Sequence, residues 1–415
     1  MPSHRLIAGI DIGNSQVKVV ISKVTRENLC PEIVGVGSAP SQGLRRGMVV
    51  DMEETLRSIR TATGQAQEAS SERIKRAYLS VSGQHINTQT SRGVIAVSRA
   101  DSEISQNDID RVIQAASVVS LPPNREIIDV IPRNFIVDGT DSIKNPLGMK
   151  GVRLEAEVFI IDGLSPHLRN LAKCVNECNI EVAGLVYAPL VATYSALDKN
   201  QKEYGVMHLD FGGGTSSLAV FEEADLVYAT VLPVGSRHIT NDLAIALRTS
   251  LDIAEQIKLE HAITSQGDSM RSRGNIDLSE YLDEENFLYP RKQLVRVVDA
   301  RVHELLDLVR TELKKVSHSG RLPAGVVLSG GGSNLPGFAL VIKDVLKLPV
   351  RIGKPFHVDD HSEMAADPSY MVAVGLVLWG FEHEFGKALQ KGGVFPIASD
   401  GLIFRILQWL KNFMP

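Results

Sequence analysis

The sequence predicts an α/β fold of two similar halves, because one structural unit occurs twice in a chain of 415 residues. A chain of this length exceeds one ordinary hydrophobic core and is expected to form several domains. An apolar segment ends in Asp11, and a glycine turn and a second apolar segment follow it. The same order returns at Asp210. A repeated strand-turn-strand unit favours two subdomains that face each other.

The first half is predicted from the spacing of apolar residues. Apolar segments typical of buried strands lie at 6–11, 17–21, 32–37 and 77–82. Apolar side chains at helical spacing predict helices at 52–69, 166–178 and 371–379. We therefore expect one subdomain over 1–82, 164–205 and 365–385.

Residues 83–163 differ in character and predict a small α+β insertion. One helix is expected near 108–119, and it ends before the helix-breaking pair Pro122-Pro123. Strand-like segments surround it at 93–97, 127–137 and 155–161. The insertion is therefore expected to form a unit of its own.

The second half repeats the plan of the first. Strands are predicted at 206–211, 217–221, 226–232 and 325–328, and helices at 240–248, 252–261 and 294–315. We expect one subdomain over 206–234 and 323–364, and another over 235–322. Glycines and a proline within 386–400 predict a flexible linker before a separate segment at 401–415.

Composition excludes several classes of protein. The net charge of −5 gives no reason to expect nucleic acid as a partner. Three cysteines, Cys30, Cys174 and Cys178, are too few for a disulfide framework and lack zinc spacing, so reduced thiols are expected. No segment reaches the ~20 apolar residues of a membrane span. We therefore expect the protein in the cytoplasm.

The two glycine turns predict a cleft that binds the phosphates of ATP. Backbone N–H groups of a tight turn can point at an anion, and glycine permits positive φ and close approach. Lys18 adds positive charge, and Asp11 and Asp210 can hold Mg²⁺ through its waters. The chain lacks the Walker motif at these turns. Two ordinary hairpins are the alternative.

Three further features fit a nucleotide. Gly235 follows a strand and can approach the phosphates. A triple glycine at 330–332 precedes a segment whose backbone can lie against adenine. Glu255 and Lys258 are three residues apart on one predicted helix and can reach a ribose, or they form an ordinary surface ion pair. The residues predicted to contact the nucleotide are Asp11, Gly13, Asn14, Ser15, Lys18, Gly212, Gly213, Gly214, Thr215, Gly235, Glu255, Lys258, Gly330, Gly331, Gly332 and Ser333.

The last fifteen residues, 401–415, predict a basic amphipathic helix. Such a helix is about 20 Å long, too short for a ~30 Å hydrocarbon core, so it is expected to lie in the interface of an anionic membrane. The alternatives are docking on the protein's own core or on a partner. The residues predicted to contact lipid are Leu402, Ile403, Phe404, Arg405, Ile406, Trp409, Leu410, Lys411 and Phe413.

The order of these features resembles the actin–Hsp70–hexokinase superfamily. The resemblance implies an actin-like, ribonuclease H-like fold of two domains and four subdomains that binds ATP and Mg²⁺. The superfamily hydrolyses ATP with a water that a Glu often orients, and here Ala188 stands before Pro189 at that place. Asp210 is left as the catalytic candidate. Loss of a water-orienting group costs a factor of about 10²–10⁴, so at most a weak ATPase is expected.

Within that superfamily, the chain resembles the bacterial cell-division family FtsA over nearly its full length. The residues that carry the resemblance are 9–13, 81–83, 131–135, 144–148, 151–154, 210–215 and the terminal helix. The family resemblance implies protofilaments that anchor FtsZ at the cytoplasmic face of the membrane, at the division site, and that recruit later division proteins. The FtsZ C-terminal peptide is then expected on 233–322, at Arg301, with Arg291, Lys292 and Arg296 as further candidates. A solvated helix face is the alternative for these cations.

Three alternatives remain open on the sequence. A sugar kinase of the same superfamily needs a sugar pocket with a catalytic Asp, and no such motif is found. A chaperone of the Hsp70 type needs a large domain after Trp379. A pilus-assembly relative with a similar insertion is expected to lack the amphipathic tail.

Overall fold

The computed structural model describes residues 4–25, 31–267, 274–282, 287–316, 322–355 and 364–390. This range excludes Cys30, the part of the predicted linker beyond Gln390, and the predicted membrane helix with all of the residues predicted to contact lipid. Within it, no helix is both long and apolar enough to cross a bilayer.

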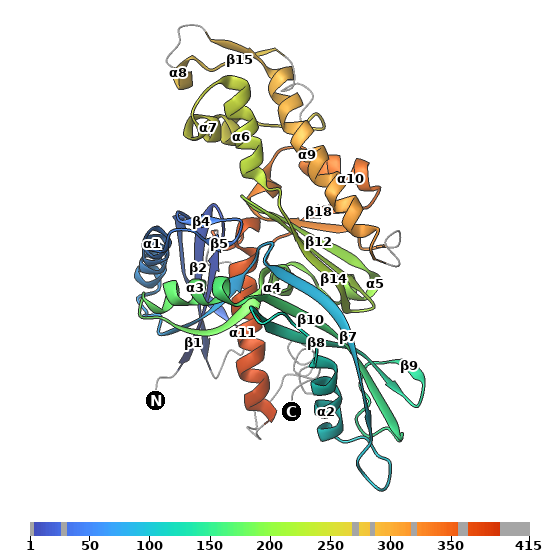
Figure 1. Ribbon diagram of the computed structural model, residues 1–415. Helices are drawn as coiled ribbons and strands as arrows, with labels where there is room; N and C mark the ends of the chain where they lie inside the picture. The colour runs from blue at the N-terminus through green and yellow to red at the C-terminus, as the bar shows by residue number, and fades with distance from the viewer. Residues whose placement is uncertain are drawn as a thin grey trace.

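Two five-stranded sheets with the same topology form the two halves (Figure 1). In each, the first three strands form an antiparallel meander, and two further strands run parallel to the first. The first sheet holds β1 (His4–Ile12), β2 (Gln16–Thr25), β3 (Glu32–Pro40), β6 (Arg76–Val81) and β11 (Glu181–Tyr187). The second holds β12 (Val206–Phe211), β13 (Ser216–Glu222), β14 (Asp225–Leu232), β17 (Val326–Ser329) and β18 (Val350–Ile352). The predicted repeat and the actin-like α/β fold are confirmed.

Two buried helices lie between the sheets. They are α4 (Ala188–Ala196) and α11 (Met371–Gln390), and α11 runs through the middle of the molecule in Figure 1. The α11 helix packs on the first sheet and α4 on the second. Gly375 permits their close approach, since a Cβ there would lie 2.1 Å from the carbonyl oxygen of Val191. The α11 helix continues to Gln390, so residues 386–390 are helical, where a linker was predicted.

The outer face of the first sheet is covered by α1 (Met52–Ser70) and α3 (Ser165–Asn176). The α1 helix begins where the Asp51 side chain accepts a hydrogen bond from the Glu54 N–H, an N-cap that satisfies one free donor. Gly37 lets this helix lie against β3, because a Cβ there would be 2.1 Å from the carbonyl oxygen of Ala62. The short strands β4 (Leu44–Arg45) and β5 (Met48–Val49) pair near the turn of β1 and β2.

A helical unit extends from the second sheet and lies at the top of Figure 1. Its long helix α9 (Arg291–Leu313) presents Val298, Val302 and Leu305 to α6 (Ser236–Leu247) and to the core of the second half. The remaining elements of the second half are α5 (Lys199–Tyr204), α6 (Ser236–Leu247), α7 (Leu251–His261), β15 (Asn275–Asp277), α8 (Ser279–Leu282), β16 (Leu288–Pro290), α9 (Arg291–Leu313) and α10 (Phe338–Leu346), with the 3₁₀ turns Gly331–Asn334 and Pro368–Tyr370.

The insertion forms its own antiparallel sheet, with strand order β7-β10-β8-β9 and one helix packed on it. Its elements are β7 (Ile86–Ala96), α2 (Gln106–Ser117), β8 (Arg125–Val137), β9 (Thr140–Ile143) and β10 (Arg153–Leu164). Asp162 is fully buried at its base and pairs with Arg125. The insertion also contacts the second half: Thr88 Oγ1 donates to the Ala229 carbonyl at 3.0 Å, and Lys144 pairs with Asp225.

Candidate nucleotide-binding site

The two predicted glycine turns face each other where β1 and β12 end. The first turn is closed by the Gly13 N–H, which donates to the Gln16 carbonyl at 3.0 Å. Asn14 Nδ2 lies 3.5 Å from Thr215 Oγ1 of the second turn. A Cβ on Gly213 would lie 1.8 Å from Ser15 Oγ. Segments far apart in sequence are therefore brought together at one place between the halves.

Close approach explains the glycines of both turns, and positive φ does not. None of Gly13, Gly212, Gly213 and Gly214 has φ in the left-handed region, so that part of the prediction is wrong. A Cβ on Gly212 would lie 2.8 Å from the Thr215 carbonyl oxygen. A Cβ on Gly214 would lie 2.9 Å from Cβ of Asn14. The turns need residues without side chains because they pack on themselves and on each other.

The start of α6 holds the second turn in place. The Ser236 and Arg237 N–H groups donate to the carbonyls of Gly212 and Gly213 at 2.8 and 2.7 Å. Gly235 makes room for this, since a Cβ there would lie 2.5 Å from the Gly213 carbonyl oxygen. The N–H groups of Gly213 and Gly214, like that of Ser15, have no acceptor among the described residues. Such donors in facing turns form an anion-binding concavity.

Asp11 and Asp210 are half-buried beside the buried Lys18 at the base of the turns. Burial raises the pKa of Asp11, against a hydrogen bond from Ser80 and the charge of Lys18. Burial also raises the pKa of Asp210 to about 6, and the neighbouring charge of Asp11 adds to this. Burial lowers the pKa of Lys18, while Asp11 and Asp210 oppose that change. A cation between the carboxylates would favour their ionised forms.

The donor set fits a hydrated Mg²⁺. The described residues contain no cluster of three or more His, Cys, Asp or Glu side chains that could enclose a metal directly. Two neighbouring carboxylates suit an ion that keeps several of its waters. Lys18 Nζ donates to the Ser369 carbonyl at 2.7 Å, which fixes its charge beside the two acids.

The predicted adenine loop is attached to the second turn through Phe211. A Cβ on Gly330 would lie 2.6 Å from the Phe211 carbonyl oxygen, and one on Gly332 would lie 2.3 Å from Phe211 Cδ1. Gly330 also needs its positive φ of 83°. A Cβ on Gly331 would meet nothing closer than 4.0 Å, so this glycine has an open side. Ser333 Oγ donates to the Gly330 carbonyl at 2.7 Å and closes the loop.

Glu255 and Lys258 form the ion pair that the sequence left as the alternative. Lys258 Nζ lies 2.7 Å from Glu255 Oε2 and donates to Thr240 Oγ1 at 3.0 Å. The pair joins α7 to α6. Its contact with a ribose stays a prediction.

Sequence reasoning missed two serines that hold the cleft carboxylates. Ser80 Oγ donates to Asp11 Oδ1 at 2.6 Å, and Ser329 Oγ donates to Asp210 Oδ2 at 2.9 Å. His208 Nε2 lies 2.9 Å from Ser329 Oγ. Burial lowers the pKa of His208 to about 3, with Arg351 and Lys202 adding to the effect, so its ring is neutral. Ala188 is buried at the start of α4 and offers no group that could orient a water.

The four cations predicted to bind an acidic peptide have different surroundings on α9. Arg301 is held by Asp242, through bonds of 2.8 and 2.9 Å, and pairs with Glu304. Lys292 and Arg296 are exposed, and Arg291 is half-buried.

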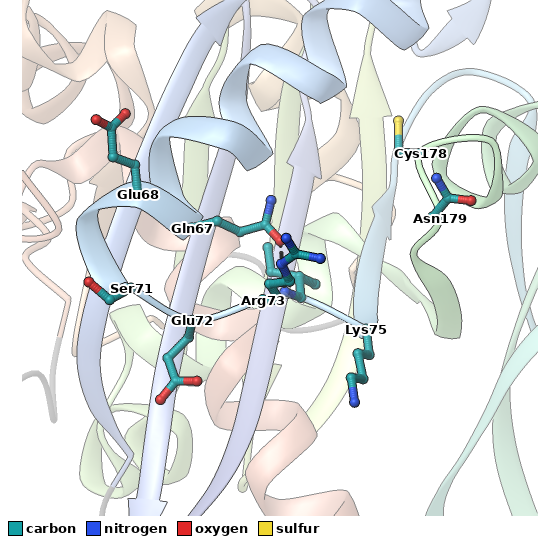
Figure 2. Close-up of a pocket in the computed structure, with 9 residues that line it drawn as sticks. Gln67, Glu68, Ser71, Glu72, Arg73, Lys75, Cys178 and Asn179 are labelled. Carbon is teal, nitrogen blue, oxygen red and sulfur yellow. Dashed lines mark hydrogen bonds between the residues drawn. The ribbon is translucent and has the colours of Figure 1, made fainter.

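A separate pocket of about 700 Å³ lies at the opposite end of the first sheet (Figure 2). It opens between the end of α1, the start of β6 and the segment before β11. Glu68, Glu72, Arg73 and Lys75 give its lining charges of both signs. None of the predicted site residues lines it. The nucleotide prediction therefore rests on the turns and not on this pocket.

Comparison with known proteins identifies relatives along nearly the whole chain. A family model described as "SHS2 domain inserted in FTSA" matches residues 83–162, and one described as "Cell division protein FtsA" matches 207–375. Cell division protein FtsA of Pseudomonas aeruginosa is 34% identical over 414 residues, which cover 99% of this chain and 98% of the relative. The Bacillus subtilis FtsA is 38% identical over 380 residues, covering 91% and 84%.

Solved structures share the fold at low identity. The PilM-PilN type IV pilus biogenesis complex aligns with a TM-score of 0.65 at 17% identity, covering 90% of this chain and 98% of that one. MreB5 of Spiroplasma citri bound to AMPPNP aligns with a TM-score of 0.56 at 14% identity, covering 94% and 100%. These likenesses show the actin-like fold alone. The extended sequence matches show more, and the chain belongs to the FtsA family of cell division proteins.

Proposed function

We propose that the protein is an ATP-binding, actin-like scaffold that polymerises on the cytoplasmic face of the membrane and anchors FtsZ filaments at the division site. Recruitment of later division proteins is part of the same proposal, as are the predicted subdomain limits. The observation that carries it is the pair of facing glycine turns above Asp11, Asp210 and Lys18 in a member of this family. Family membership decides against the sugar kinase, the chaperone and the pilus-assembly protein.

ATP is proposed to act mainly as a conformational ligand. The turns supply N–H donors to its phosphates, and Lys18 supplies charge. Bound Mg²⁺ would neutralise phosphate charge, held through water by Asp11 and Asp210. Ala188 replaces the group that orients the attacking water, which leaves Asp210 as the catalytic candidate. We therefore propose at most a weak ATPase.

The tail at 401–415 is proposed to attach the protein to anionic lipid. Deleting these residues is expected to move the protein from the pellet to the supernatant when it is centrifuged with anionic liposomes. A single short amphipathic helix binds weakly, so several tails on one assembly are needed for stable attachment. A second variant, Arg405→Glu with Lys411→Glu, keeps the apolar residues and tests the contribution of charge. It should weaken pelleting, most clearly at low salt. Equal pelleting of the deletion variant would rule out this attachment.

The FtsZ C-terminal peptide is proposed to dock on α9 and its neighbours. Lys292→Glu with Arg296→Glu is expected to weaken binding of that acidic peptide about 10-fold, as two exposed attractions become repulsions. Fluorescence anisotropy of a labelled peptide measures the change. The matched control reverses charge at Lys199 and Lys343, which are exposed on other elements.

Arg301 is unsuited to a first test of peptide binding. Its removal would also leave Asp242 and Glu304 without their partner. Equal peptide affinity of the α9 double variant and of its control would contradict docking at Lys292 and Arg296.

A further inference from the structure

The two halves support their cleft carboxylates in the same way. In each half, a serine lies on the parallel strand next to the strand that carries the aspartate. Asp210 and Ser329 are register partners in β12 and β17. In the first half, β1 and β6 pair through Gly9 with Tyr78 and Ile10 with Leu79, which brings the following residues, Asp11 and Ser80, side by side. The internal repeat therefore includes a serine that donates to each aspartate.

Each serine occupies one carboxylate oxygen and leaves the other available. Ser80 donates to Oδ1 of Asp11, and Ser329 donates to Oδ2 of Asp210. Among the described residues, the second oxygen of each aspartate accepts no hydrogen bond. The free Oδ1 of Asp210 lies on the side of the second glycine turn, 3.6 Å from the position of a Cβ on Gly212.

His208 fixes the direction of the Ser329 hydroxyl. Both side chains are fully buried, and Nδ1 of His208 has no hydrogen-bond partner among the described residues. A proton on Nδ1 would leave a buried donor unsatisfied, which is costly. The ring therefore carries its proton on Nε2, which lies 2.9 Å from Ser329 Oγ and donates to it. Ser329 then donates its single hydroxyl proton to Asp210.

We propose that Ser80 and Ser329 are positioning residues that fix Asp11 and Asp210 for a hydrated divalent cation, and that His208 directs the Ser329 hydroxyl. This inference rests on the proposed binding of Mg²⁺ and ATP. Groups that hydrogen-bond to metal-binding side chains hold those side chains in the binding orientation, and their loss costs about 10–100-fold in metal affinity. The proposed cation binds through its waters, and a carboxylate held in one orientation binds those waters better than a mobile one. The free oxygens can then accept from metal-bound water without reorganisation.

The test compares the affinity for a fluorescent ATP analogue in Mg²⁺ and in EDTA. In Ser329→Ala, the ratio of the Kd in EDTA to the Kd in Mg²⁺ is expected to fall about 10-fold or more. The Mg²⁺ concentration that gives half of the effect is expected to rise about 10-fold. The Kd in EDTA should change little, because the turns are intact. Ser329→Thr keeps the hydroxyl and should restore the Mg²⁺ response. Ser80→Ala should repeat the effect from the other half.

Two further variants separate positioning from general stability. Ser195→Ala removes another fully buried hydroxyl, one that donates to the Met371 carbonyl at 2.7 Å, and should leave the Mg²⁺ response unchanged. His208→Gln retains an N–H donor and should bind Mg²⁺ better than His208→Leu. Thermal melting checks that each variant is folded.

Either of two results in the serine variants would overturn the inference. An equal change in Kd with Mg²⁺ and with EDTA in both serine variants would show a merely structural role. No change at all would show that the serines are dispensable. If Mg²⁺ improves ATP binding equally in the wild type and in the serine variants, the role of the serines is contradicted and the proposed function still stands. A wild-type protein whose ATP affinity ignores Mg²⁺ would overturn both.

Discussion

Gly213→Asp is expected to lower the affinity for ATP by about 100-fold or more, which corresponds to about 3 kcal/mol. A Cβ at this position would lie 1.8 Å from Ser15 Oγ, so the two turns would have to separate. The added carboxylate would also repel the phosphates at a site built from N–H donors. Titration with a fluorescent ATP analogue measures the loss.

Gly64→Asp is the matched control for this substitution. It makes the same chemical change on the exposed face of α1, where a Cβ would meet nothing within 4 Å. The control should bind ATP as the wild type does. Unchanged ATP affinity in Gly213→Asp would remove the nucleotide from the glycine turns.

Arg125→Met is expected to lower the free energy of unfolding by about 3–5 kcal/mol. Asp162 is fully buried, and its other hydrogen bond, from Asn87 Nδ2, is 3.3 Å long. Without Arg125, a carboxylate remains in the interior with little compensation. Arg125 Nη2 also donates to the His85 carbonyl at 3.1 Å, so its removal costs a second hydrogen bond within the insertion. Urea denaturation measures the loss, and hydrogen exchange in β8 and β10 locates it.

The double substitution Arg125→Met with Asp162→Leu distinguishes an unpaired charge from lost packing. Replacing both partners by apolar side chains of similar size removes the buried charge, so the double variant should be more stable than Arg125→Met alone. If the double variant is the less stable of the two, the loss comes from packing and the explanation by charge is wrong.

Local patterns predicted most of the fold. Strands β1 and β12 are apolar segments that lead through an aspartate into a glycine turn, and β2 and β13 are the apolar segments that follow the turns. The α9 helix has apolar residues at helical spacing. The α4 helix was missed because it is buried almost all round, so it has no polar face and no amphipathic period. The β18 strand was missed because Val350–Ile352 is too short to show a pattern.

The candidate site could be predicted only where it is local in sequence. The glycine turns and their aspartates lie within a few residues of one another. The Ser80–Asp11 and Ser329–Asp210 bonds join residues 69 and 119 positions apart. The Arg301–Asp242 pair spans 59 positions. Such pairs depend on strand register and helix packing, which cannot be predicted from a local sequence pattern.

Co-sedimentation tests directly whether the protein is an ATP-bound tether between FtsZ and the membrane. A labelled FtsZ C-terminal peptide is centrifuged with anionic liposomes and the full-length protein, with and without ATP and Mg²⁺. We expect the peptide to pellet only when the protein is present, and to a greater extent with ATP and Mg²⁺, because assembly brings several tails to one surface. Two results would contradict an ATP-bound tether. The peptide could stay in the supernatant while the protein pellets, or the amount of peptide in the pellet could be the same with and without ATP.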